Sequence, residues 1–123
     1  HNDSDPHHPS AVDAMSAMAS GRWGDALLPE YVLVETITVV MARCGLDRAR
    51  MVGVHLIETS GFEIVAGTTV FGRAWDVFRF QPGPRLSFVD AAVVAVARLH
   101  GARHVATFDS DFRGLPGLSV VPR

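Results

Sequence analysis

Apolar side chains recur along most of this chain every three or four residues, the period of a helix that buries one face. Each such stretch is followed within a few residues by Gly, which commonly ends helices. The stretch 30–43 is rich in β-branched residues, which favour strand, but its length and Pro29 at its start favour helix. The predicted helices cover residues 9–19, 30–43, 46–60, 68–80 and 87–100.

Short apolar runs lie between these helices and predict strands. They occupy residues 26–29, 62–66, 104–107 and 118–121. Strands that alternate with helices usually pair in parallel, because the helix carries the chain back to the same end of the sheet. We therefore expect one α/β domain over residues 1–123, with helices on both faces of a short parallel sheet.

The helix 87–100 has the clearest boundaries. Ser87 and Asp90 form the S-x-x-D pattern of a capping box, and Gly101 supplies the stop. Thr68 or Thr69 is expected to cap the helix before it.

Composition narrows the class of protein. A chain of 123 residues that is 48% hydrophobic is large enough for one domain with a core. It has no apolar run long enough to span a bilayer, so we expect a soluble protein without membrane contact. The one cysteine, Cys44, fits a reducing compartment and a cytoplasmic location. A formal net charge of −2 argues against binding nucleic acid by bulk charge alone, although all eleven basic residues are Arg, which suits phosphate.

Candidate chemistry gathers around the strand 104–107. Asp109 and Asp111 follow that strand, and sites in α/β sheets form at the carboxyl ends of strands. A short turn joins the helix 87–100 to the strand, so the two should pack antiparallel and bring Asp90 towards Asp109. Each acid also has a purely structural interpretation, since Asp90 and Asp109 both occupy positions typical of helix caps.

Glu35 is the one charged residue in the apolar segment YVLVETITVVM. A buried carboxylate without a partner is costly, so Glu35 either turns to solvent or shares a site. Carboxylates held close together need a cation to stay ionised, and all-oxygen sites suit Mg²⁺ or Mn²⁺. Phosphodiester hydrolysis is the chemistry that such a site serves.

The histidines and other motifs indicate less. His7 and His8 lie in a polar loop, and His55, His100 and His104 fall at predicted helix or strand ends, where a structural role is favoured. The sequence contains no phosphate-binding glycine loop, and nothing near Cys44 suggests a nucleophile.

Three segments resemble one known family. The segment LSFVDAAVVAVARLHGARHVATFDSDFRGLPGLSVV is similar to the C-terminal half of PIN-domain proteins, in particular the toxin ribonucleases of VapBC toxin–antitoxin systems. VLVETITVV resembles the family's helix with an internal Glu, and NDSDPHHPSAV resembles the loop and helix after its first strand.

The resemblance implies a three-layer α/β/α fold with a parallel sheet of about five strands, and metal-dependent endoribonuclease activity. The residues that match acidic metal-site positions are Glu35, Asp90, Asp109 and Asp111. Thr107 matches a hydroxyl residue that orients a carboxylate or water, and Ser87 matches the helix-capping Ser. Implied partners are an RNA substrate, a cognate antitoxin and a second copy in a homodimer, for which the helices 30–43 and 46–60 are the expected surface. The implied cofactor is Mg²⁺ or Mn²⁺.

The sequence departs from the family pattern at its start. The family's first strand ends in an Asp, whereas this sequence begins after that strand, and Asp3 and Asp5 match the loop beyond it. We expect the native protein to carry the missing segment. Without it, the sheet should have a gap and the site should lack one ligand.

Two other functions stay open at this point. One is a non-catalytic PIN-like module that acts through protein contacts, with its acids kept as caps. The other is a receiver-like signalling domain, which is disfavoured because the chain has no Lys. Three basic residues precede the helix 87–100 in sequence: Arg73, Arg79 and Arg85. They would contact phosphates or an antitoxin, or form a solvated surface.

Overall fold

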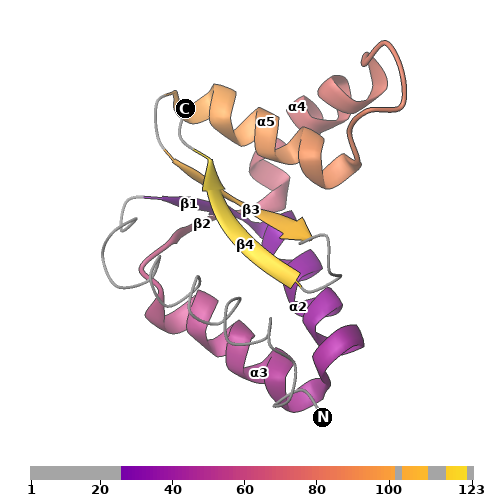
Figure 1. The fold of residues 1–123 in the computed structure, drawn as a ribbon. Coiled ribbons are helices and arrows are strands. Elements are labelled where there is room, and N and C mark those ends of the chain that lie inside the picture. The colour runs from indigo at the N-terminus through magenta and orange to yellow at the C-terminus, as the bar shows by residue number, and fades with distance from the viewer. Residues whose placement is uncertain (1–25, 102–103, 111–115, 122–123) are drawn as a thin grey trace.

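A mixed sheet runs through the middle of the molecule with helices on both sides (Figure 1). The computed structural model describes residues 26–101, 104–110 and 116–121. The helix predicted over 9–19, the histidines of the first loop and Asp111 lie outside these residues. The elements are β1 (Leu27–Pro29), α2 (Glu30–Cys44), α3 (Leu46–Val54), the π-helical turn η3 (His55–Thr59), β2 (Glu63–Val65), α4 (Gly67–Arg79), α5 (Phe88–His100), β3 (Val105–Ser110) and β4 (Pro116–Val121).

The described strands stand in the order β2-β1-β3-β4. β1 pairs in parallel with β2 and with β3, as predicted, but β3 and β4 are antiparallel, with Thr107 opposite Ser119. The predicted parallel pairing is therefore wrong for this last pair of strands. The pair is antiparallel because the connection between Ser110 and Pro116 is short. Parallel pairing would require a crossover of about a dozen or more residues.

β1 and β3 are direct neighbours in the sheet. The Leu27 N–H donates to the carbonyl of His104 at 2.7 Å, and Leu27 is in register with Val105. The expected gap is thus not seen among the described strands. The β1–β3 ladder is nevertheless short, with one registered pair against three between β1 and β2.

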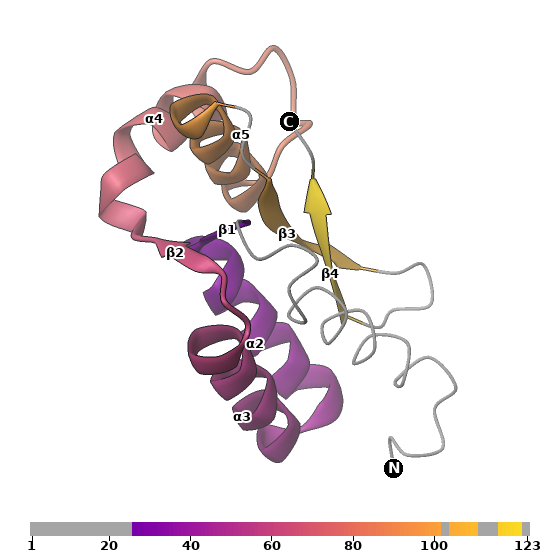
Figure 2. The same ribbon diagram turned by 90° about the vertical axis from the view of Figure 1, so that its left-hand side faces the viewer.

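Alternate residues of the strands point into two separate layers of core. Leu28 and Ala106 pack with α2 and α3, whereas Leu27 and Val105 pack with α4 and α5. This period of two is the geometry of a strand buried on both faces. Figure 2 shows the two helix pairs on opposite sides of the sheet. Leu27 and Leu28 are completely buried, so replacing either with Ala should cost about 2–5 kcal/mol of stability.

The α2–α3 hairpin turns at Gly45, which adopts φ of 92° as expected for a glycine stop. Pro29 lies one position earlier than predicted: it is the N-cap of α2, and Glu30 is the first helical residue. None of the helices in the described ranges is long and apolar enough to cross a membrane.

Candidate functional site

Two carboxylates from distant parts of the sequence lie close enough to influence each other where α2 and α5 begin. Glu35 lies in the second turn of α2, which starts directly after β1, and is half-buried. Asp90 lies in the first turn of α5 and is exposed. Burial raises the pKa of Glu35, and the negative charge of Asp90 raises it further. Glu35 therefore has a partner, and that partner is another acid.

Asp90 also completes the predicted capping box. Its backbone N–H donates to Ser87 Oγ at 3.0 Å, and its Oδ2 accepts from the Ser87 N–H at 3.1 Å. The capping interpretation of Asp90 is confirmed, and it leaves Oδ1 outside the capping box. The cap fixes the carboxylate in place beside Glu35 instead of competing with that position.

Thr107 and Asp109 lie on β3. The strand was predicted to end at Thr107, but it continues to Ser110, so Asp109 belongs to the strand and its backbone pairs with Gly117 of β4. Pairing with β4 explains the longer strand. The interpretation of Asp109 as a cap and its expected approach to Asp90 both stay predictions, because the side chain of Asp109 and residues 111–115 are outside the described part of the chain.

Among the described residues, no three His, Cys, Asp or Glu side chains form a metal-binding group. Two of the four predicted acids, Glu35 and Asp90, are brought together; Asp111 lies outside the described residues. The chemistry of the pair fits a divalent cation, because two neighbouring carboxylates offer the oxygen ligands that Mg²⁺ and Mn²⁺ prefer.

The first turn of α2 is also hydrogen-bonded to the start of α4. The Gly67 N–H donates to Glu30 Oε1 at 2.6 Å, and Tyr31 Oη donates to the Gly67 carbonyl at 3.4 Å. Glu30 thus takes the place of the predicted Thr68 or Thr69 cap, since α4 has no side-chain cap of its own. The helix dipole also favours a carboxylate at the N-terminal end of a helix, where Glu30 lies relative to α4. Sequence reasoning missed this contact because it joins residues far apart in the chain.

A ring contact lies beside the acid pair. Tyr31 and Phe88 meet edge to face, with centroids 5.7 Å apart and planes at 68°. Tyr31 precedes Glu35 by one helical turn, and Phe88 precedes Asp90 by two residues. The aromatic contact therefore holds the starts of α2 and α5 together, while the two acids beside it repel each other.

Of the basic residues predicted for phosphate or partner contacts, Arg73 and Arg79 lie on α4, and Arg85 lies between α4 and α5. Arg79 forms an exposed ion pair with Asp76 at 3.1 Å and covers the Phe80 ring at 4.1 Å. Arg73 and Arg98 line a cleft of about 570 Å³ between α4 and α5. The exposed ion pair between Arg79 and Asp76 contributes little to the stability of the fold.

The predicted structural histidines lie at element ends. His55 begins η3, His100 ends α5 and His104 precedes β3. Within the described part of the chain, Nε2 of His55 and of His100 is buried without a hydrogen-bond partner. Cys44 is half-buried at the end of α2.

Comparison with known proteins identifies the family. The PIN domain family matches residues 1–118, so this chain belongs to the PIN-domain family. The chain is also similar to VapC20 from Mycobacterium tuberculosis, a toxin that cleaves the sarcin-ricin loop and whose crystal structure is known. The two chains are 25% identical in sequence, and their structures superpose with a TM-score of 0.61. The match covers 91% of this chain and 83% of that one. No curated protein sequence matches the chain significantly.

Together these matches define a VapC-like PIN-domain protein with an α/β/α fold. They exclude the receiver-like alternative. They also agree with the mixed sheet and the two helix layers described above.

Proposed function

We propose that this protein is a metal-dependent endoribonuclease, the toxin of a VapBC-type toxin–antitoxin pair. Its site would comprise Glu35, Asp90, Asp109 and Asp111 as ligands of Mg²⁺ or Mn²⁺, with Thr107 orienting a carboxylate or water. Residues 1–123 would form a single domain. The family match and the likeness to an RNA-cleaving toxin support the class of activity.

The observation that carries the proposal is the Glu35–Asp90 pair. A half-buried carboxylate that is further disfavoured by a neighbouring acid costs free energy in the folded protein, and a divalent cation between them would offset this cost. When bound, Mg²⁺ or Mn²⁺ would stabilise charge on the scissile phosphate and activate a water.

The chain's own residues would prepare the site before any ion binds. The capping box holds Asp90 through Oδ2, so its position is set by the backbone of α5. Glu35 is set by α2, which is anchored to β1 at one end and to α4 through Glu30. Rigid placement of this kind is what preorganised electrostatic sites require.

The partners follow from the same proposal. RNA would be the substrate, a cognate antitoxin would cover the site, and a second copy would pair through α2, α3 and η3. These helices expose several large apolar side chains: Val34, Met41, Leu46, Met51, Val54 and Ile57. Exposed apolar side chains are typical of a protein contact where they form a contiguous patch.

The test is cleavage of RNA by the purified protein, without antitoxin, in Mn²⁺ and in EDTA. Wild type should cleave only in Mn²⁺, and Glu35→Gln and Asp90→Asn should each reduce the rate at least about a hundredfold. Ser87→Ala is the matched control, since it removes the cap but keeps the Asp90 carboxylate. Cleavage that survives in EDTA, or that is unaffected in both acid variants, would contradict the proposal.

The alternative is a non-catalytic PIN-like protein-interaction module. Its acids would serve only as caps, as Asp90 does in part. Metal titration separates the two functions: a nuclease site should raise the melting temperature in millimolar Mn²⁺, and an interaction module should not.

A further inference from the structure

The loop between α4 and α5 is held by the side chain of Gln81. The loop has few backbone donors, because Pro82 and Pro84 have no N–H. Gln81 Oε1 accepts from the N–H of Arg85 at 3.0 Å and from that of Leu86 at 2.8 Å. Its Nε2 donates to the Leu86 carbonyl at 3.1 Å. Gln81 therefore uses both ends of its amide on the backbone directly before α5.

The amide of Gln81 has a defined orientation. The backbone N–H groups that face Oε1 can only donate, and the Leu86 carbonyl that faces Nε2 can only accept. A flipped amide would place donor against donor and acceptor against acceptor. The half-buried side chain of Gln81 thus presents its NH₂ group, and not its oxygen, to the Leu86 carbonyl.

One peptide group joins Gln81 to Asp90. The Leu86 carbonyl and the Ser87 N–H belong to the same planar unit, so neither can turn without the other. Gln81 Nε2 donates to the oxygen of this Leu86–Ser87 peptide, and the N–H of the same peptide donates to Asp90 Oδ2 at 3.1 Å. A donor at the carbonyl polarises the peptide, which strengthens its N–H as a donor to the carboxylate.

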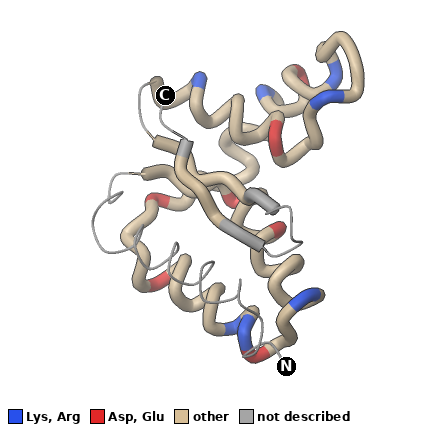
Figure 3. The backbone as a smooth tube through the Cα atoms, viewed as in Figure 1, with Lys and Arg blue, Asp and Glu red and all other residues tan. Residues whose placement is uncertain are grey.

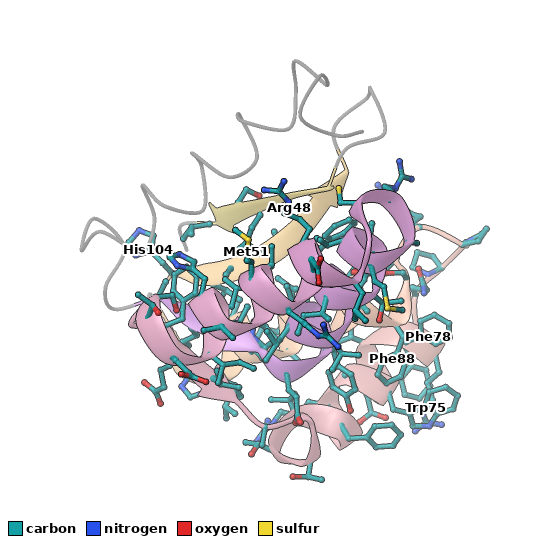
Figure 4. All side chains as sticks on the ribbon, turned by 90° about the horizontal axis from the view of Figure 1, so that it is seen from below. Arg48, Met51, Trp75, Phe78, Phe88 and His104 are labelled. Carbon is teal, nitrogen blue, oxygen red and sulfur yellow. The ribbon has the colours of Figure 1, made fainter. Side chains whose placement is uncertain are left out.

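Aromatic packing holds the start of α5 in another way. The ring centroid of Phe88 lies 5.7 Å from those of Tyr31, Phe71 and Phe78. Figure 4 shows Phe88 beside Phe78, and Figure 3 shows an acidic position where α5 begins. The ring contacts set where the helix lies, whereas the bond from Gln81 restrains how the peptide before the helix is turned.

We propose that Gln81 is a positioning residue that holds the Asp90 carboxylate in place through the Leu86–Ser87 peptide. The inference rests on the proposed nuclease function, in which Asp90 is a ligand of Mg²⁺ or Mn²⁺. Gln81 itself would touch neither the ion nor the RNA. Outer hydrogen-bond partners of this kind orient metal ligands, and their loss commonly lowers metal affinity or activity about 10–100-fold.

Gln81→Glu isolates the bond to the Leu86 carbonyl. The carboxylate is close in size to the amide and still accepts from Arg85 and Leu86, but it cannot donate. Its negative charge would by itself attract a cation, so a weaker affinity for Mn²⁺ could not come from charge. Gln81→Met, the second variant, removes all three contacts without adding charge. Val52→Ala, at a buried position on α3, is the matched control because it lowers stability away from the loop.

The amide resonance of Ser87 reports the link without metal or RNA. In EDTA, the proton of an N–H bonded to a carboxylate resonates downfield, and both Gln81 variants should move the Ser87 signal upfield. Asp90→Asn should move it in the same direction, and Gln81→Glu should add little to that change. Val52→Ala should leave the signal in place. An unchanged Ser87 signal in both Gln81 variants would overturn the inference.

Mn²⁺ calorimetry and cleavage kinetics give the second readout. Gln81→Glu should weaken Mn²⁺ binding about tenfold and lower kcat, while KM for RNA stays within about twofold of wild type. In an Asp90→Asn background, the same substitution should have no further effect on Mn²⁺ binding. Equal losses in both backgrounds, or an equal loss in Val52→Ala, would mean that Gln81 acts only through stability and would overturn the inference.

Failure of the nuclease proposal gives a different result. If wild type binds no Mn²⁺ and cleaves no RNA, but the Ser87 signal responds to Gln81→Glu, the nuclease proposal fails and the hold of Gln81 on Asp90 stands. If wild type cleaves RNA in Mn²⁺ and folded Gln81→Glu matches it in Mn²⁺ affinity and kcat, the nuclease proposal stands and the positioning role of Gln81 fails.

Discussion

The negative charge of Asp90 on α5 adds to burial in raising the pKa of Glu35 on α2. The two acids are far apart in sequence and each is held by its own helix, one next to β1 and the other behind a capping box. A protein without a bound cation keeps this repulsion in its folded state. The Glu35–Asp90 pair is therefore expected both to bind the proposed metal ion and to make the stability of the fold depend on pH.

The stability of the metal-free protein should depend on pH through Glu35. Its folded-state pKa is above the usual value of 4.5, so the folded protein binds this proton more tightly than the unfolded chain. The resulting contribution to the free energy of unfolding is present at pH below about 4.5 and is lost as pH rises through the raised pKa. Glu35→Gln should remove this dependence and be more stable than wild type at neutral pH in EDTA. Urea unfolding across pH checks it, with Glu58→Gln, exposed on η3, as the control.

Ser87→Ala and Asp90→Asn should separate the two roles of Asp90. Ser87→Ala removes the hydroxyl that accepts the Asp90 N–H and should cost about 0.5–2 kcal/mol of stability, with most RNA cleavage retained. Asp90→Asn keeps an amide able to cap but removes the charge, so activity should fall far more than stability. Thermal melts and cleavage rates on the same preparations check this. A parallel loss of activity in both variants would mean that the cap, not the charge, supports function.

Gly67→Ala and Gly72→Ala should have opposite effects, although both lie in α4. A Cβ at Gly67 would lie 3.0 Å from Tyr31 Cζ, and that ring is itself held against Phe88. We expect a loss of about 1–3 kcal/mol from overpacking. At Gly72 a Cβ meets nothing within 4 Å, so the better helix propensity of Ala should add about 0.5–1 kcal/mol. Chemical denaturation of both variants decides the matter.

Ile57→Glu should weaken the proposed homodimer. Ile57 is 54% exposed on η3 and is one of the exposed apolar side chains of α2, α3 and η3. A charge buried at an interface core without a partner commonly costs several kcal/mol, so the dimer should dissociate at micromolar concentration. Sedimentation velocity measures this, with Phe71→Glu as the control on the opposite helix layer. A dimer that is insensitive to Ile57→Glu but lost in Phe71→Glu would place the interface on α4.

The sequence by itself determined the elements and the family. The helical spacing of apolar residues located α2 to α5, and the S-x-x-D pattern gave the cap of α5, because both depend on interactions within a few residues. The resemblance in the segment around Asp90 and Asp109 gave the PIN-domain family, which the family match bears out.

Tertiary structure decided what depends on residues distant in the chain. The antiparallel β3–β4 pair extended β3 through Asp109, and direct β1–β3 pairing replaced the expected gap. Glu30, not Thr68 or Thr69, came to cap α4, because the start of α2 packs there. The acid at position 35 was visible in the sequence as an anomaly among apolar residues. Only the packing of α2 against α5 showed that its neighbour is Asp90, since local pattern carries no information on which helices meet.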